Sequence, residues 1–265
     1  MERVSGKIAL VAGGASGIGR ASALMLAKEG ARVAISDINL DGARAVADEI
    51  GENAIAIAHD VTQEDAWTMA LNTVVAAYGG LNVLVNCAGS AIGGTVEETS
   101  FEDWKWLHSL DLDSVFLGCK YAIAHIAASG GGSIVNISSI SGIIAGHNLA
   151  AYNSAKAGVR HLTKSVALHC AKQGNQVRCN SVHPAFVDTP ILAEMRLKVF
   201  DTMLRLQPRE YDPDLPVRIV DIDNESLERL GQWPWPRTLV AELVLRLTEA
   251  GAAVIAFDAV FAKPD

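Results

Sequence analysis

The sequence predicts an α/β protein with a Rossmann-type, doubly wound parallel sheet. Two observations carry this prediction. Short apolar segments of strand length alternate with amphipathic segments of helix length over the first two-thirds of the 265-residue chain. The apolar segments are continuous, which is typical of parallel strands buried on both faces. Crossovers between such strands are right-handed, so helices are expected on both sides of the sheet.

Six strands and five helical stretches are predicted in chain order. The strands, apolar and often β-branched, are expected at residues 7–12, 31–36, 54–58, 83–86, 133–138 and 177–182. The helical stretches, with apolar residues at helical spacing, are expected at residues 21–29, 41–50, 63–78, 101–128 and 152–173. Glycines 30, 79 and 174 follow three of them, as favoured at a helix C-terminus. The stretch 101–128 is expected to break near Asp111.

Composition excludes several classes of protein. The formal net charge is −8, and no Lys- or Arg-rich run is present, so neither nucleic acid nor an anionic membrane surface is an expected partner. No apolar run approaches the ~20 residues of a membrane span, and no signal peptide is recognised. The four cysteines lack metal-ligand spacing, so no metal site is expected. We therefore expect a cytoplasmic protein with reduced thiols.

A glycine-rich turn between the first strand and the first helix predicts a dinucleotide site. Gly13, Gly17 and Gly19 allow a tight turn, and the helix that follows offers free backbone N–H groups to a pyrophosphate. Asp37 follows the second strand, about 18 residues beyond Gly19. A carboxylate there can accept hydrogen bonds from both ribose hydroxyls of NAD and would repel the 2′-phosphate of NADP. The sequence therefore predicts NAD as cofactor.

Tyr152 and Lys156 stand four residues apart in a predicted helix, so their side chains share a face. Their spacing, with Ser139 thirteen residues before Tyr152, resembles the classical short-chain dehydrogenase/reductase family. The resemblance covers about residues 1–197. The motifs that carry it are the glycine turn at 13–19, Asp60-Val61, Asn86-Cys87-Ala88-Gly89, Ser138-Ser139, Tyr152-Asn-Ser-Ala-Lys156 and His183-Pro184 with Thr189.

The resemblance implies a role for each matching residue. Tyr152 is the acid/base, favoured as phenolate by the Lys156 ammonium, and Ser139 hydrogen-bonds the substrate oxygen. Lys156 also contacts the nicotinamide ribose. The residues implied to bind the cofactor are Gly13, Ser16, Gly17, Ile18, Gly19, Asp37, Asp60, Val61, Asn86, Ala88, Gly89, Tyr152, Lys156, Pro184, Val187 and Thr189. The reaction implied is the interconversion of a secondary alcohol and a ketone.

The chain departs from the family pattern at three positions. Ala12 replaces a usual Thr, and Ala185 replaces a usual Gly. Asp111 stands where the family commonly has a catalytic Asn that supports a helix kink and a water in the proton relay. A carboxylate accepts hydrogen bonds but cannot donate as an amide does, although it could bind a water or pair with Lys156. We count Asp111 among the catalytic residues and expect a slowed proton relay.

The C-terminal part does not follow the family. Residues 216–265, with the Trp233-Pro-Trp-Pro-Arg237 run, resemble the start of the second subtype of CHASE sensor domain. The predicted organisation is a core at 1–197, a linker at 198–215 and a sensor-like fragment at 216–265, which suggests a chimera. A strand at 216–223, a helix at 238–250 and a strand at 252–257 are expected. This segment could complete the open edge of the sheet.

The expected substrate is a hydrophobic alcohol or ketone, cyclic or steroid-like. The positions that line the pocket in the family are mostly apolar here: Ile143, Ile144, His147, Phe186, Ile191, Leu192 and Met195. The family also implies a homodimer or homotetramer packed through the helices at 101–128 and 152–173. Two alternatives stay open: a protein that binds NAD with little or no turnover, and a sensory or interaction module that acts through the tail.

Overall fold

The structure is a computed structural model that describes residues 2–185 together with residues 242, 243, 245, 246 and 249. The chain divides into two compact units, residues 1–207 and 208–265. In the second unit the described positions are all helical, in agreement with the helix predicted at 238–250. The predicted strands at 216–223 and 252–257 and the linker at 198–215 lie outside the described residues.

The described part of the first unit contains one parallel sheet of six strands, in the order β3-β2-β1-β4-β5-β6. The strands are β1 (Ile8–Ala12), β2 (Arg32–Asp37), β3 (Ala54–Ala58), β4 (Val83–Asn86), β5 (Gly132–Ile137) and β6 (Val177–Val182). All five neighbouring pairs are parallel. The strand order reverses direction between β1 and β4, where ligands bind in doubly wound folds. The predicted Rossmann-type sheet is confirmed.

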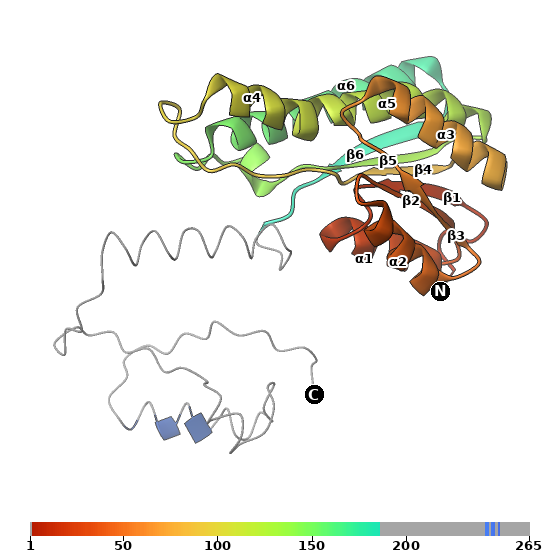
Figure 1. Cartoon of the computed structure of the whole chain (residues 1–265), viewed down its shortest axis with the longest axis horizontal. Coiled ribbons are helices and arrows are strands. Elements are labelled where there is room, and N and C mark those ends of the chain that lie inside the picture. The colour runs from red at the N-terminus through yellow and green to blue at the C-terminus, as the bar shows by residue number, and fades with distance from the viewer. Residues whose placement is uncertain (1, 186–241, 244, 247–248, 250–265) are drawn as a thin grey trace. The chain divides into compact units, whose positions relative to one another are not determined.

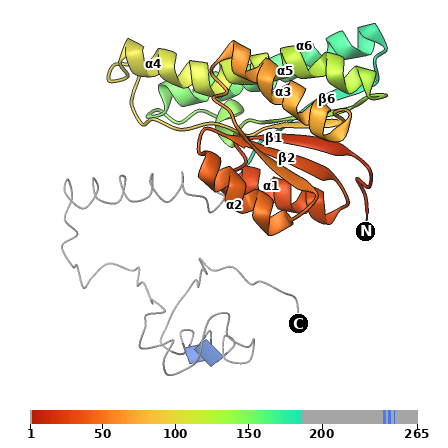
Figure 2. The same cartoon turned by 45° about the vertical axis from the view of Figure 1, so that its right-hand side comes forward.

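Helices cover both faces of this sheet (Figure 1). They are α1 (Gly17–Lys28), α2 (Leu40–Ile50), α3 (Glu64–Tyr78), α4 (Phe101–His108), α5 (Ser114–Ala128) and α6 (Ala150–Gln173). Figure 2 shows α1 and α2 together on one side and α3, α5 and α6 together on the other. None of the helices in the described ranges is long and apolar enough to cross a membrane.

The two faces of β1 explain why its sequence is apolar without interruption. Leu10 packs into the core formed with α3, α5 and α6, whereas its neighbours Ala9 and Val11 pack into the core formed with α1 and α2. All three are fully buried. Because successive side chains of a strand point to opposite faces, a strand covered on both sides has no position for a polar residue. β1 is therefore buried between the two helical layers.

Two helical features differ from the prediction. α1 begins at Gly17, four residues before the predicted start at 21, because the second half of the glycine-rich turn already forms its first turn. A short 3-10 helix at Ile140–Gly142 was not predicted.

The predicted break in the stretch 101–128 is confirmed and takes the form of a π-helical turn, Ser109–Asp113, which contains Asp111. Such turns are rare and frequently occur at functional sites.

The outer edge of the sheet at β6 carries no further strand in the described residues, since β6 pairs with β5 alone. On the face covered elsewhere by α1 and α2, Val135 and Ile137 are only partly buried, and Val182 is 47% exposed. Apolar strand residues are normally covered in a sheet of this class.

Candidate active site

The glycine turn after β1 is held by backbone contacts that only glycine permits. The N–H groups of Gly13 and Gly14 donate to the carbonyl oxygen of Ser36, at 2.8 and 3.1 Å. Gly13 has a φ of +80°, and a Cβ at this position would lie 2.4 Å from the backbone nitrogen of Ala88. A Cβ at Gly19 would lie 1.9 Å from the carbonyl oxygen of Gly13. At Gly13 the turn therefore packs against the segment after β4, and at Gly19 it packs on itself, with no room for a side chain at either position.

The N-terminus of α1 is open to an anion. Its N-cap residue, Ser16, is extended, and the Ser16 side chain makes no capping hydrogen bond. The first turn, which includes Ile18, contains no acidic residue. The N–H groups of a first helical turn have no partner within the helix, and the helix dipole favours negative charge there. This turn therefore fits the pyrophosphate of a dinucleotide, with no side chain competing for it.

Asp37 lies at the end of β2, beside the same turn. Its Oδ2 accepts a hydrogen bond from the N–H of Ala15 at 3.0 Å, and its Oδ1 accepts one from the N–H of Asn39 at 2.9 Å. A carboxylate offers about four lone-pair sites, so both oxygens keep acceptor capacity. The arrangement fits the hydroxyl groups of a ribose bound next to the pyrophosphate.

The other residues expected at the cofactor lie at the ends of β3, β4 and β6. Asp60 Oδ1 accepts from the Thr62 hydroxyl at 2.7 Å, and the backbone N–H of Ala88 donates to the carbonyl of Ala12 at 3.0 Å. Val61 is 5% exposed. The carbonyl of Pro184 accepts from the N–H of Ile140 at 2.9 Å. Val187 and Thr189 lie outside the described residues.

Asn86 is placed in the interior of the fold. It is 4% exposed, and its amide Nδ2 donates to Oδ1 of Asn136 at 2.8 Å. Asn136 in turn donates to the hydroxyl of Thr163 at 2.9 Å. The Oδ1 atom of Asn86 is buried and has no hydrogen-bond partner in the structure. The described contacts of the Asn86 side chain thus join β4, β5 and α6 beneath the cofactor turn.

The structure brings Tyr152 and Lys156 together on α6. The Nζ atom of Lys156 lies 5.6 Å from the centroid of the Tyr152 ring. Lys156 is 5% exposed, and its Nζ also donates to the carbonyl of Ile137, at the end of β5, at 3.3 Å. The ammonium is therefore anchored between the helix and the end of the sheet, next to the phenol.

Ser139 lies immediately after β5 and is 8% exposed. Its Oγ accepts from the N–H of Ser141 at 3.1 Å, which caps the 3-10 helix. The neighbouring Ser138 hydroxyl donates to the carbonyl of Lys156 at 2.8 Å and so ties this loop to α6. The ring nitrogen Nδ1 of His183 donates to the carbonyl of Ser139 at 2.9 Å. Since Oγ keeps its own proton, it can donate to a substrate oxygen.

Asp111 forms a buried ion pair with Lys156. Asp111 Oδ2 lies 2.9 Å from Lys156 Nζ, and Asp111 is fully buried. Its Oδ1 accepts a hydrogen bond from the N–H of Ser90 at 2.8 Å. Both ends of the pair pack on Gly89, where a Cβ would lie 3.2 Å from each of Asp111 Oδ2 and Lys156 Nζ. Of the two uses expected for a carboxylate here, the structure shows the pairing with Lys156.

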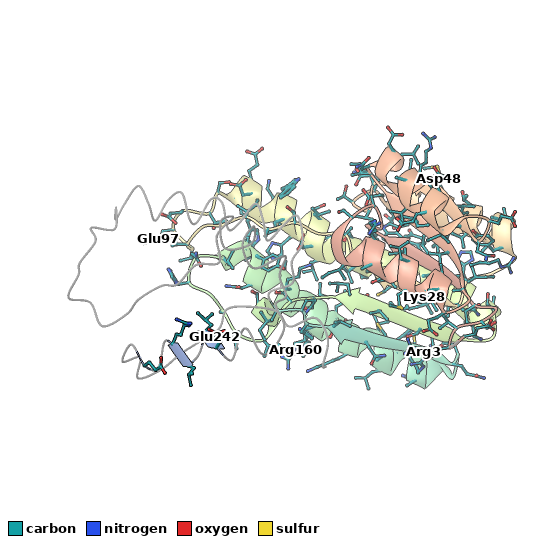
Figure 3. All side chains as sticks on the ribbon, turned by 90° about the horizontal axis from the view of Figure 1, so that it is seen from below. Arg3, Lys28, Asp48, Glu97, Arg160 and Glu242 are labelled. Carbon is teal, nitrogen blue, oxygen red and sulfur yellow. The ribbon has the colours of Figure 1, made fainter. Side chains whose placement is uncertain are left out.

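This pair contrasts with charged side chains outside the site. Four of those labelled in Figure 3 are Arg3, Lys28, Asp48 and Arg160, and all four are exposed. Burial raises the pKa of Asp111 above its usual range, against the opposing effects of Lys156 and the Ser90 N–H. Burial lowers the pKa of Lys156, but the charges of Asp111 and Tyr152 outweigh this effect and raise it. The 2.9 Å contact between Asp111 Oδ2 and Lys156 Nζ favours the charged form of each partner, a carboxylate with an ammonium.

Two contacts of the site and one neighbouring thiol were not predicted from the sequence. The N–H of Ser90 binds Asp111 through the backbone, so any residue type could do so. His183 supports the carbonyl of Ser139 across 44 residues of chain. Cys87 lies close enough to Lys156 for the two to affect each other's charge, yet burial raises the pKa of its thiol to about 11. Only the motif spacing around His183 could have suggested one of these roles.

The fold and this arrangement define a nucleotide-dependent oxidoreductase, and the comparisons agree. The family model for short chain dehydrogenases matches residues 7–199, so the chain belongs to this family of oxidoreductases that use nicotinamide cofactors. A model of the CHASE2 domain matches residues 181–265, consistent with a chimera of the two families. The two matches overlap between residues 181 and 199.

Three relatives illustrate the similarity. A 3-beta-hydroxysteroid dehydrogenase of Comamonas testosteroni is 39% identical over 225 residues, which is 82% of this chain and 88% of the relative. An NADP-dependent (R)-specific alcohol dehydrogenase of Lentilactobacillus kefiri is 39% identical over 73% of this chain and 78% of the relative. A cyclohexanol dehydrogenase of an Acinetobacter species is 40% identical over 72% of this chain and 77% of the relative.

Proposed function

We propose that this protein is an NAD(H)-dependent oxidoreductase that interconverts a hydrophobic secondary alcohol and its ketone. The observation that carries the proposal is the placement of Tyr152 beside the buried Lys156 ammonium, 5.6 Å from its ring centroid. The Lys156 end of this pair packs on Gly89, in the segment that follows β4 and also meets the glycine turn through Ala88. The proposed acid/base group and the nucleotide turn therefore both lie next to the segment that follows β4.

The proposed roles of the protein's groups follow from their chemistry. In alcohol oxidation, the phenolate of Tyr152 accepts the hydroxyl proton while the carbinol carbon loses a hydride, and the C–O bond becomes a carbonyl. The nicotinamide ring supplies the hydride acceptor, or the hydride in the reverse reaction. Ser139 Oγ donates a hydrogen bond to the substrate oxygen and stabilises the charge on it. Lys156 stabilises the phenolate, and ketone reduction returns the same proton from Tyr152.

The preference for NAD over NADP rests on Asp37. Its two oxygens are fixed by the N–H groups of Ala15 and Asn39, so the carboxylate stays beside the expected ribose. A 2′-phosphate would lie against this negative charge. One relative uses NADP, which shows that the overall similarity does not decide the cofactor. In our proposal, the charge of Asp37 decides between NAD and NADP.

A hydrophobic, cyclic or steroid-like substrate is supported by two features. Ile143 and Ile144 are 52% and 64% exposed in the loop between Ser139 and Tyr152. Exposed aliphatic side chains next to reactive groups favour an apolar ligand. Two of the relatives named above are a 3-beta-hydroxysteroid dehydrogenase and a cyclohexanol dehydrogenase. His147 is exposed in the same loop, whereas Phe186, Ile191, Leu192 and Met195 lie outside the described residues.

We also propose a homo-oligomer, with the dimer as its basic unit. Several large apolar side chains are exposed on α4, α5 and α6, namely Phe101, Trp106, Phe116 and Leu168. Large exposed apolar side chains on neighbouring helices favour association through those helices. Light scattering of the purified chain would give the mass of a dimer or tetramer. A monomer at micromolar concentration would contradict this proposal.

The C-terminal segment, which is related to the CHASE2 domain, is proposed to stabilise the folded enzyme. The support is the edge of β6 that carries no further strand in the described part of the chain, with Val182 47% exposed. An uncovered edge invites aggregation. Truncation after Met195 is therefore expected to give an insoluble or less stable protein. A soluble truncated protein with unchanged dehydrogenase activity would contradict this role.

Titration with NADH and, separately, NADPH tests the proposed function, with binding followed by nicotinamide fluorescence. We expect NADH to bind at least tenfold more tightly than NADPH. A second candidate function, NAD binding without turnover, is favoured by the buried pairing of Lys156 with Asp111. Binding of NADH without reduction of cyclohexanone or a 3-ketosteroid would support that alternative. Ligand binding by the tail alone would instead indicate a sensory or interaction module.

A further inference from the structure

The buried pair of Asp111 and Lys156 places a carboxyl group, in direct contact with an ammonium, where the family pattern has a neutral amide. Asp111 Oδ2 is 2.9 Å from Lys156 Nζ, and Asp111 and Lys156 are 0% and 5% exposed. Charges this close and this poorly solvated interact strongly, because little water screens them. Tyr152, whose ring lies 5.6 Å from the same Nζ, therefore meets an ammonium whose charge is largely compensated.

We propose that Asp111 is a positioning residue that sets the pH window of the reaction by neutralising Lys156, so that Tyr152 remains a proton donor to higher pH. The inference rests on the proposed function, in which Tyr152 is the acid/base group. A phenolate is favoured by an uncompensated ammonium and disfavoured by a nearby carboxylate. The native enzyme should therefore reduce ketones over a wide pH range and begin to oxidise alcohols only at higher pH.

The position of Asp111 is held firmly enough for this role. The π-helical turn Ser109–Asp113 carries Asp111 toward α6, and the N–H of Ser90 fixes the second carboxylate oxygen at 2.8 Å. The Asp111 Oδ2 atom lies 2.9 Å from Lys156 Nζ, so the carboxylate and the ammonium are in direct contact. The effect of Asp111 on Tyr152 is therefore electrostatic and passes through Lys156.

Other titratable groups around this pair do not replace Asp111. His108, one turn before it on α4, donates from Nδ1 to the carbonyl of Trp104 at 2.8 Å, and its Nε2 lies 3.1 Å from the Ser154 hydroxyl. Cys87 remains a neutral thiol at working pH, since burial raises its pKa to about 11. The remaining groups around the site are Asp37, which is held by backbone N–H groups at the end of β2, and His183, which contacts the carbonyl of Ser139. In the part of the chain that the structure describes, Asp111 is the carboxylate paired with Lys156.

The variant Asp111→Asn removes the charge and keeps the shape of the side chain. We expect the pH at which kcat/KM for cyclohexanol oxidation rises to move down by about one unit, because the variant loses a carboxylate charge that disfavours the Tyr152 phenolate. Asp111→Ser removes the same charge and serves if the Asn variant does not fold. Asp113→Asn, on the same turn but exposed, is the matched control and should leave the profile unchanged.

A second readout needs neither substrate nor cofactor. The ultraviolet absorbance of the tyrosinate at position 152 is obtained by subtracting the pH titration of Tyr152→Phe, made in both the native and the Asp111→Asn background. We expect this absorbance to develop about one pH unit lower without the Asp111 charge. Unchanged absorbance and rate profiles in folded Asp111 variants would overturn the inference. If the native protein reduces no ketone, the proposed function fails, and the absorbance comparison still decides the role of Asp111.

Discussion

The two ends of the site are held together by different kinds of contact. At the nucleotide end, the contacts of Gly13 and Gly14 with Ser36 are made by the backbone. At the proposed catalytic end, the contact between Asp111 and Lys156 joins two side chains that are 45 positions apart in the sequence. Backbone constraints leave a local trace in the form of glycines, whereas a distant side-chain pair leaves none. The difference separates what a motif can predict from what requires a structure.

The largest expected effect concerns the catalytic end. Tyr152→Phe removes the proposed acid/base group and should lower the rate of ketone reduction about a thousandfold, which is typical for loss of a general acid. The affinity for NADH, measured by fluorescence, should change little. Tyr121→Phe, which removes a phenol that contacts Glu64 on the surface, is the control. A Tyr152→Phe enzyme with more than a tenth of native activity would contradict the role of Tyr152.

The next largest effect is a loss of stability at low pH, caused by a buried histidine close to the nucleotide end. His59 Nδ1 lies 3.0 Å from the Ser36 hydroxyl, and His59 is 3% exposed with its Nε2 unpartnered. Burial lowers the pKa of His59 from 6.5 to about 4. Above pH 6.5 the ring is neutral in both states and the pKa difference has no effect. As the pH falls from 6.5 to about 4, the unfolded chain binds a proton that the folded chain does not, so the folded state loses about 3 kcal/mol.

Denaturant unfolding at several pH values measures this loss. The free energy of unfolding of His59→Gln should fall less between pH 7 and pH 4 than that of the native protein. His169→Gln removes an exposed imidazole on α6 and should behave like the native protein. Equal pH dependence in native protein and His59→Gln would contradict the burial of a neutral ring.

A smaller effect is expected in the glycine turn, measured as the difference in unfolding free energy between two glycine variants. Gly13 and Gly6 both have positive φ, +80° and +71°, but a Cβ at Gly6 would meet nothing within 4 Å. Gly6→Ala should therefore cost only the backbone strain, about 1 kcal/mol of unfolding free energy. Gly13→Ala adds a clash with Ala88 and should cost about 2 kcal/mol more. Equal losses in the two variants would show that the turn and the segment after β4 are not in close contact.

The smallest effect separates charge from shape at Asp37. Asp37→Asn keeps the side-chain volume and removes the charge, so the preference for NADH over NADPH should fall about tenfold. The measurement is the ratio of the two dissociation constants from fluorescence titrations. Asp41→Asn, nearby on α2 and paired with Arg44 on the surface, is the control. An unchanged ratio in Asp37→Asn would remove the argument for NAD.

The sequence predicted the sheet and the helices closely because their signals are local and repeated. β3, β4 and β6 have the predicted bounds. The start of α1 was predicted late because glycines in the turn hide its first residues. The break near Asp111 was predicted, but the contact of Asp111 with Lys156 was one of two alternatives. A choice of that kind depends on how two helices pack, which no single segment encodes.

The pKa of His59 could not be predicted from the sequence for the same reason. The residue comes after β3 and directly before Asp60, and its imidazole packs on the Trp67 ring, with the ring centroids 4.4 Å apart. The buried network of Asn86 and Asn136 likewise depends on neighbouring strands that are 50 positions apart. Polar groups in the interior are thus specified by the fold as a whole.

Transfer of deuterium from labelled cofactor tests the central claim most directly. The purified protein is incubated with NADH carrying deuterium at the transferable position of the nicotinamide, together with cyclohexanone or a 3-ketosteroid. Mass spectrometry then locates the label in the product. The account predicts one deuterium on the carbinol carbon of the alcohol with the native protein and almost none with Tyr152→Phe. Tight binding of NADH with no labelled alcohol from either ketone would contradict it, and would leave a protein that binds the cofactor without turnover.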